Sequence, residues 1–183
     1  MKKNRIISSF AGALMLCGAA FAMSAKAEEL TDLTKADAVW RGHFKTGKLE
    51  VKAAEKIMDD APGIQVKGLT SEKRQTYAAI VHSFKEAQDW SKMKSLEFFY
   101  RQEDEIFIKV SIICEGGSLS TGWLRNIEDS MFKKFDISLD KFNKKDTPDL
   151  SKVKRIIFGF GLWKLDTTED EFTVELAKIS TVE

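Results

Sequence analysis

The stretch that decides the fold is DLSKVKRIIFGFGLWKLDTTEDEFTVELAKI, residues 149–179. On both sides of its acidic turn TTEDE, large apolar residues recur at every second position: Ile156, Phe158, Phe160, Phe172, Val174 and Leu176. Ile157, Gly159, Gly161 and Trp163 have the opposite parity in the first half. A period of two is typical of strands that bury one face. The stretch therefore predicts two strands that cover a core.

The same alternation continues towards the N-terminus. It is clear in LEFFYR (96–101), IFIKVSII (106–113) and FKKFDISL (132–139), and we expect the first two of these to form a hairpin across QEDE. Residues 59–63 predict a turn, 115–118 a loop, 120–125 a short strand and 140–148 a long polar loop. Roughly nine short strands with few helical patterns indicate an all-β sandwich.

The first 27 residues have the pattern of a secretory signal peptide. A basic start with Lys2, Lys3 and Arg5 precedes an apolar run, and Ala25-Lys26-Ala27 forms a cleavage site before Glu28. We expect residues 1–27 to be removed and 28–183 to form a single domain. The product would be exported, to the periplasm or beyond, with no membrane anchor. Cys17 is a poor lipidation site because Leu16 precedes it.

Charge and cysteine content limit the classes of partner. Cleavage would remove four basic residues and no acidic one, which changes the formal charge from +1 to −3. No basic excess would remain to favour nucleic acid or an anionic membrane. Cys114 would be the only cysteine left, so no internal disulfide is expected, and its position at a strand end predicts a small buried residue.

Several segments resemble one family. The 149–179 stretch is similar to the C-terminal end of jelly-roll carbohydrate-binding modules, in the galactose-binding-like β-sandwich group. QDWSKMKSLEFFYR (88–101) and FKKFDISLDKF (132–142) resemble the middle of those modules, and Trp40 with Gly42 resembles their opening. The resemblance covers residues 40–179 and implies a galactose-binding-like jelly-roll β-sandwich that binds glycans. Complex-I assembly factors share the sandwich, so the fold does not fix the function.

The resemblance also implies structural roles. Trp40 and Trp90 match core positions of those modules. Their last strand often carries an acidic pair that contributes to a structural calcium site, whereas Ala177 and Lys178 occupy the matching positions here. Calcium needs several oxygen ligands and lysine supplies none. We therefore expect no metal at that site, and no cofactor.

No catalytic constellation stands out. His43 and His82 are not in metal-binding spacing, and neither a G-x-S-x-G motif nor a nucleotide-binding glycine loop is present. Carboxylates are plentiful, so a small glycosidase remains a third hypothesis. No acidic residue lies isolated at the end of an apolar strand, which is where burial would raise its pKa. We therefore predict a non-catalytic protein with no catalytic residues.

A sugar-binding face should carry exposed aromatic rings beside charged residues, on the side of a sheet away from the core. The residues that fit are Tyr77, Phe99, Arg101, Phe107, Lys109, Trp123 and Trp163. We predict that they bind a polysaccharide or oligosaccharide on a concave sheet. The alternative is an exported protein-interaction domain of the same fold, whose ligand is another protein.

Overall fold

The computed structural model describes residues 28–29, 40–44, 47–70, 77–102, 105–126, 130–163 and 171–183. In these segments no helix is long and apolar enough to cross a membrane. The cleaved segment predicted at residues 1–27 lies outside them, as do residues 167–170 of the predicted acidic turn TTEDE.

Strands make up most of the described chain. They are β1 (Glu28–Glu29), β2 (Trp40–Phe44), β3 (Gly47–Met58), β4 (Ala61–Thr70), β5 (Tyr77–Gln88), β6 (Ser95–Gln102), β7 (Phe107–Ser120), β8 (Leu124–Arg125), β9 (Lys133–Ser138), β10 (Asn143–Gly161) and β11 (Glu171–Val182). One 3₁₀ turn, Leu139–Lys141, precedes β10. The described residues thus contain eleven strands rather than nine, partly because the two-residue strands β1 and β8 are too short to show a period.

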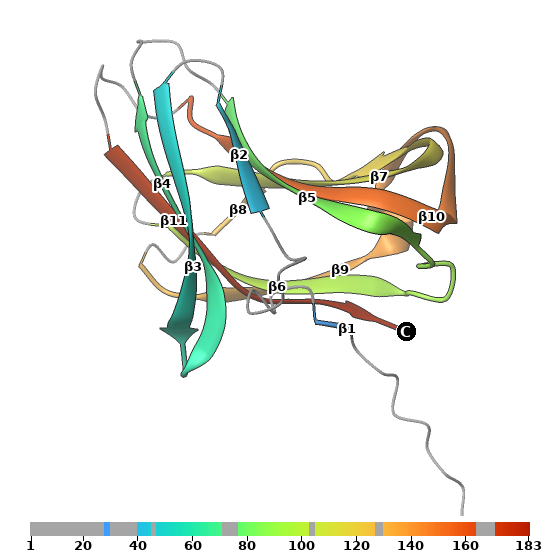
Figure 1. Cartoon of the computed structure of the whole chain (residues 1–183), viewed down its shortest axis with the longest axis horizontal. Coiled ribbons are helices and arrows are strands. Elements are labelled where there is room, and N and C mark those ends of the chain that lie inside the picture. The colour runs from blue at the N-terminus through green and yellow to red at the C-terminus, as the bar shows by residue number, and fades with distance from the viewer. Residues whose placement is uncertain are drawn as a thin grey trace, which may run out of the picture.

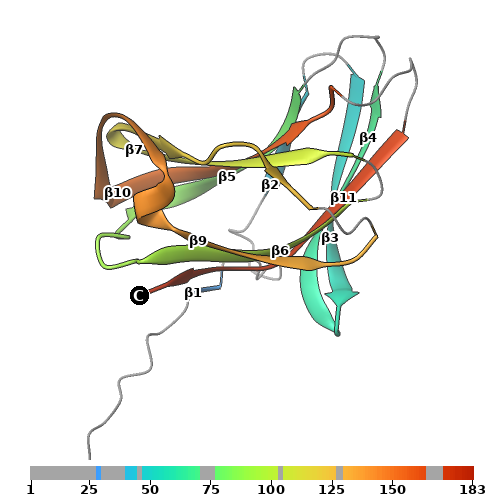
Figure 2. The same ribbon diagram turned by 180° about the vertical axis from the view of Figure 1, so that it is seen from behind.

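The strands form two antiparallel sheets. The six-stranded sheet has the order β3-β4-β11-β6-β9, with β1 paired to β11, and the five-stranded sheet has the order β2-β5-β10-β7-β8. Figure 1 shows them as two layers, with β5, β10 and β7 in one and β6, β9 and β11 in the other. Seen from behind, β10 and β11 again lie in different layers (Figure 2). This architecture confirms the predicted β-sandwich.

The two strands of the deciding stretch face each other across the core. β10 is the middle strand of one sheet and β11 is the middle strand of the other. All six large residues of the predicted alternation are at most 2% exposed. The period of two therefore identified the buried face of both strands correctly.

Phe158 lies at the centre of this core. Its ring centroid is 5.6 Å from that of Trp40 on β2 and 5.2 Å from that of Phe98 on β6. Trp90, in the link between β5 and β6, is fully buried, and Trp40 is 7% exposed. The two tryptophans that were expected to be structural are therefore core residues.

The predicted hairpin between residues 96–101 and 106–113 is wrong. β6 pairs with β11 and β9, whereas β7 pairs with β10 and β8 in the other sheet. Packed sheets lie only about 10 Å apart, which a short link can span. Both strands have one apolar face, and alternation alone cannot distinguish pairing beside a neighbour from packing opposite it.

Two predicted loops are parts of strands. Glu115–Ser118 belongs to β7, and Asn143–Pro148 opens β10. Here β7 and β10 pair with register shifts, at a point where Gly116 has φ 75°. A Cβ on Gly117 would lie 2.4 Å from the carbonyl oxygen of Lys145, so only glycine permits this close approach.

One predicted turn is confirmed, and one predicted strand is shorter than expected. Asp59 and Asp60 form the turn between β3 and β4, with φ values of 44° and 60°. This left-handed pair is the backbone of a tight hairpin turn, where Asp is tolerated. The predicted strand at 120–125 is shorter than expected, because Ser120 ends β7 and only Leu124 and Arg125 form β8.

Cys114 is buried as predicted, although it lies within β7 rather than at a strand end. It is a free cysteine with 6% exposure near the middle of β7. Burial, together with the charge of Asp149, raises the pKa of its thiol. A raised pKa leaves less thiolate at neutral pH, which is the reactive form. The side chain is therefore suited to packing rather than to chemistry.

Candidate functional site

Four aromatic side chains meet on the outer face of the five-stranded sheet, which points away from the six-stranded sheet in Figure 1. We call Tyr77, Phe107, Trp123 and Trp163 the aromatic patch. Trp163 stacks on Phe107 with 4.9 Å between ring centroids, and Trp123 meets Trp163 edge-on at 4.8 Å. Tyr77 approaches the edge of Trp123 at 6.2 Å. Four of the seven predicted ligand-binding residues therefore form one continuous surface.

Strand register brings the patch together. Gly161 on β10 is paired with Tyr77 on β5 and with Phe107 on β7, and Phe107 is paired in turn with Arg125 on β8. Paired residues in an antiparallel sheet point to the same face. One cross-strand row thus carries two of the four rings, and Trp163 follows two residues after Gly161.

The glycines of the FGFG motif support two of the rings. A Cβ on Gly159 would lie 2.6 Å from the Tyr77 ring, and a Cβ on Gly161 would lie 2.0 Å from the Trp163 ring. The rings therefore lie directly against the backbone of β10. These aromatic rings occupy the space that side chains at positions 159 and 161 would need.

Trp123 is positioned by a segment that folds back on β7. Thr121 is 4% exposed and exchanges two hydrogen bonds with Val110. Its backbone N–H donates to the Val110 carbonyl at 2.9 Å, and its hydroxyl oxygen accepts from the Val110 N–H at 3.0 Å. Beyond β8, the buried Asn126 donates to the Met131 carbonyl at 2.9 Å. Both ends of the segment that carries Trp123 are thereby fixed.

The patch is exposed and has cations beside it. Tyr77 is 42% exposed, and Trp123 and Trp163 are each 40% exposed. The Lys109 Nζ lies 6.0 Å from the Trp123 ring centroid, and the Arg125 guanidinium lies 6.0 Å from that of Phe107. Partial burial raises the pKa of Tyr77 further from neutral pH, and its protonated hydroxyl can donate a hydrogen bond.

Phe99 and Arg101 do not join this patch. Both belong to β6 in the six-stranded sheet, on the opposite side of the molecule. The Arg101 guanidinium pairs with Glu175, which also accepts a hydrogen bond from Gln65 at 2.8 Å. The charge of Arg101 is therefore already engaged. Of the seven predicted residues, Tyr77, Phe107, Lys109, Trp123 and Trp163 lie together, while Phe99 and Arg101 form a separate pair.

Sequence reasoning missed three exposed residues on the same face as the patch, two arginines and a histidine. Arg41 and His43 on β2 are paired with Val81 and Ala79 of β5, and Arg155 shares the parity of Ile157 on β10. The parity of Arg155 was readable in the sequence. The positions of Arg41 and His43 were not, because they depend on the pairing of β2 with β5.

The glycine contacts lead to a prediction. Gly161→Ala would place a methyl group within the volume of the Trp163 ring, so we expect that ring to move off β10. The near-ultraviolet circular dichroism of the coupled Trp123 and Trp163 rings should weaken, while the melting temperature changes little. Gly122→Ala is the matched control, because a Cβ there meets nothing within 4 Å. Unchanged aromatic spectra in Gly161→Ala would show that Trp163 does not cover this glycine.

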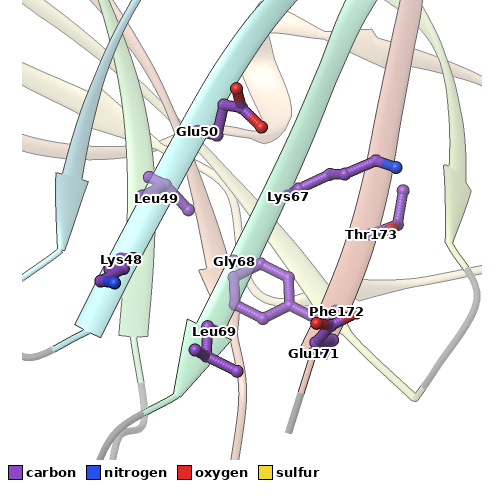
Figure 3. Close-up of a pocket in the computed structure, with 9 residues that line it drawn as sticks. All are labelled: Lys48, Leu49, Glu50, Lys67, Gly68, Leu69, Glu171, Phe172 and Thr173. Atoms are coloured by element: carbon purple, nitrogen blue, oxygen red, sulfur yellow. The ribbon is translucent and has the colours of Figure 1, made fainter. Parts of the chain in front are cut away.

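A separate shallow pocket of ≈ 420 Å³ lies on the six-stranded sheet. Residues of β3, β4 and β11 line it: Lys48, Leu49, Glu50, Lys67, Gly68, Leu69, Glu171, Phe172 and Thr173. Figure 3 shows Lys67 extending from β4 towards Thr173, its pairing partner on β11. The pocket has charges of both signs and contains none of the predicted ligand-binding residues.

The described part of the chain contains no cluster of three His, Cys, Asp or Glu side chains that could hold a metal ion. Lys178, which the sequence resemblance matched to an acidic calcium ligand, has φ 47° and lies at a bulge in β11. Its Nζ is 5.7 Å from the Phe99 ring centroid. The absence of a calcium site stays a prediction.

Comparisons with known proteins show the fold. No family model matches the chain, and no curated protein matches its sequence. Among solved structures, a family 11 carbohydrate-binding module from Clostridium thermocellum, in complex with a β-1,3-1,4-mixed-linked tetrasaccharide, is similar with a TM-score of 0.64 and 15% identity. The match covers 87% of this chain and 96% of that chain.

Two further structures give similar results. An agarase matches with a TM-score of 0.56 and 14% identity over 86% of this chain but only 24% of its own. A protein from a study of carbohydrate-binding modules of the β-sandwich superfamily matches with a TM-score of 0.55 and 8% identity, over 88% of this chain and 64% of its own. The chain therefore has the jelly-roll β-sandwich fold of the carbohydrate-binding modules.

Proposed function

We propose that this protein is an exported, non-catalytic glycan-binding protein whose ligand stacks on the aromatic patch. The observation that carries the proposal is the patch itself, because Tyr77, Trp123 and Trp163 are about two-fifths exposed on one sheet face. Large rings in a monomeric domain are usually buried, and a group of exposed ones indicates a binding surface. The likeness to carbohydrate-binding modules supports glycan as the ligand.

The chemistry of the patch suits a sugar. The C–H faces of a pyranose ring are apolar and can stack on indole and phenol rings. Hydroxyl groups at the sugar's edge need hydrogen-bonding partners, which the Tyr77 hydroxyl and the Lys109 ammonium group can supply. Because Thr121 and the two β10 glycines fix the rings beforehand, little side-chain entropy is lost on binding. Whether this sheet is concave stays a prediction.

The absence of catalysis is part of the proposal. Glycoside hydrolysis commonly requires two carboxyl groups on opposite sides of the scissile bond. Within the described segments, the cross-strand rows through Gly159 and Gly161 carry no carboxylate. A hydrolase is therefore not supported at this patch.

A glycan array probed with residues 28–183 tests the proposal. Signal for one class of polysaccharide, lost in a Trp123→Ala/Trp163→Ala double variant, would support it. A blank array together with an exported protein captured through the same two tryptophans would support the protein-interaction hypothesis instead, since exposed aromatic residues are also common in protein interfaces.

We also propose export with cleavage after Ala27. Glu28 and Glu29 form β1, which pairs with Thr181 and Ser180 of β11, so this cleavage removes none of the described strands. We expect the intact mass of the exported protein to match residues 28–183. A mass that retains residues 1–27, or a lipid on Cys17, would contradict the proposal.

A further inference from the structure

Beyond the aromatic patch, the outer face of the five-stranded sheet carries a strip of basic residues. His43, Ala79, Gly159 and Lys109 form one cross-strand row over β2, β5, β10 and β7. Three strand spacings separate its two ends, which places the His43 and Lys109 backbones about 14 Å apart. The two residues between them, Ala79 and Gly159, are buried, and the Tyr77 ring lies over Gly159, so the two basic side chains lie on either side of this edge of the aromatic patch.

Two arginines extend this strip along the strands. Arg41 lies two residues before His43 on β2, and Arg155 lies four residues before Gly159 on β10. Both are exposed, and their pairing with Val81 and Ser83 places them on the same face as Lys109. We call Arg41, His43, Lys109 and Arg155 the basic strip.

No acidic side chain balances the basic strip within the described segments. The outward positions from Gly161 back to Arg155, and their partners on β2, β5 and β7, include no carboxylate. Two acidic residues in or beside β7 already have cations: Glu105, two residues before the strand, pairs with Arg125 at 2.5 Å, and Glu115, within it, pairs with Lys152 at 3.4 Å. None of the four strip residues forms an ion pair in the described part of the chain.

Unbalanced positive charge is not a general property of the surface, as the six-stranded sheet shows. There, outward charges of both signs pair with each other: Glu97 with Lys134 at 2.9 Å, Glu50 with Lys52 at 2.9 Å, and Glu175 with Arg101. Unpaired like charges on one face destabilise the folded state. Their concentration beside the aromatic patch, in a chain that would be net acidic after cleavage, therefore indicates a ligand of opposite charge.

We propose that the ligand of this face is an anionic polysaccharide, with uronate carboxylates or sulfate esters on its sugars. This inference rests on the proposed glycan-binding function and adds the class of glycan. Sugar rings stack on the aromatic patch at one end, and the acidic groups of the following sugars meet the basic strip. Arginine donors fit a carboxylate or a sulfate in a two-pronged geometry, and Lys109 adds a point charge next to the patch.

Polymers matched in backbone but not in charge test this inference. We would measure binding by calorimetry to polygalacturonate and its fully methyl-esterified form, and to a sulfated galactan and its desulfated form, at low and high salt. We expect binding to one acidic polymer at least about tenfold tighter than to its neutral counterpart, and weaker at high salt. The two pairs distinguish a carboxylate ligand from a sulfate ligand.

A variant with Arg41→Gln, Lys109→Gln and Arg155→Gln should lose about tenfold in affinity for the acidic polymer and keep the melting temperature. Lys52→Gln, on β3 of the other sheet, is the matched control and should bind normally. An equal loss in Lys52→Gln would overturn the inference, because it would mean non-specific attraction. So would equally tight binding of a single-stranded oligonucleotide.

Different results would contradict the anionic ligand and the glycan-binding function itself. If the protein binds the neutral polymers as tightly as the acidic ones, and Trp163→Ala abolishes that binding, the anionic ligand is wrong and the glycan-binding function stands. If neither charged nor neutral polysaccharides bind, the glycan-binding function itself is wrong.

Discussion

Replacing Phe158 by alanine is expected to lower the free energy of unfolding by about 3–5 kcal/mol. The side chain is fully buried, between Trp40 of its own sheet and Phe98 of the opposite sheet. Removing the ring leaves a cavity that strands paired on both sides of β10 cannot fill by moving. Domains of ordinary size have about 5–15 kcal/mol of stability in total, so the loss would be large.

Urea or thermal unfolding measures this effect, and Ile157→Ala supplies the control. Ile157 is the residue before Phe158 on the same strand, but it points outward and is only partly buried. Its replacement should cost clearly less than that of Phe158. If Ile157→Ala destabilised the protein more than Phe158→Ala, the assignment of the two faces of β10 would be wrong.

The second large effect is on binding. Trp163→Ala should weaken glycan binding by about 1–3 kcal/mol, by analogy with the stacking of bases on aromatic side chains. The ring is 40% exposed and lies on the surface of the sheet, so the melting temperature should fall by much less than in Phe158→Ala. Calorimetry with the glycan selected by the array, together with a thermal melt, separates the two effects.

Phe107→Ala is a useful comparison for this variant. Phe107 lies against Trp163 at 4.9 Å and is less exposed, so it supports the stacking ring rather than presenting its own face. We expect a smaller loss of affinity and a larger loss of stability than for Trp163→Ala. Normal glycan binding by the Trp163→Ala protein would show that the aromatic patch is not the binding site.

The sequence was sufficient to predict which face of each strand in the deciding stretch is buried. Phe158 and Trp163 have opposite parities, and the structure places the first in the core and the second on the surface. A bulge at Gly161 would have reversed this relation. No register shift occurs there, because the pairs with Tyr77 and Phe107 continue the register of Phe160.

The sequence was not sufficient to predict which strands pair with one another. Phe99 with Arg101, and Phe107 with Lys109, look alike as alternating aromatic and basic residues, yet they lie on opposite sides of the sandwich. Which sheet a strand joins depends on contacts between residues far apart in the chain. For the same reason the basic strip became visible only when the register of β2 on β5 brought Arg41 and His43 to the face that carries Lys109.

The most direct test of the account uses the four tryptophan indole N–H signals in a nitrogen-labelled NMR spectrum. Trp40 and Trp90 are buried in the core, whereas Trp123 and Trp163 belong to the aromatic patch. Titration with an oligosaccharide of the bound class should shift the signals of Trp123 and Trp163 and leave those of Trp40 and Trp90 in place. Saturable binding that leaves the first pair unmoved would contradict the assignment of the patch as the glycan-binding site.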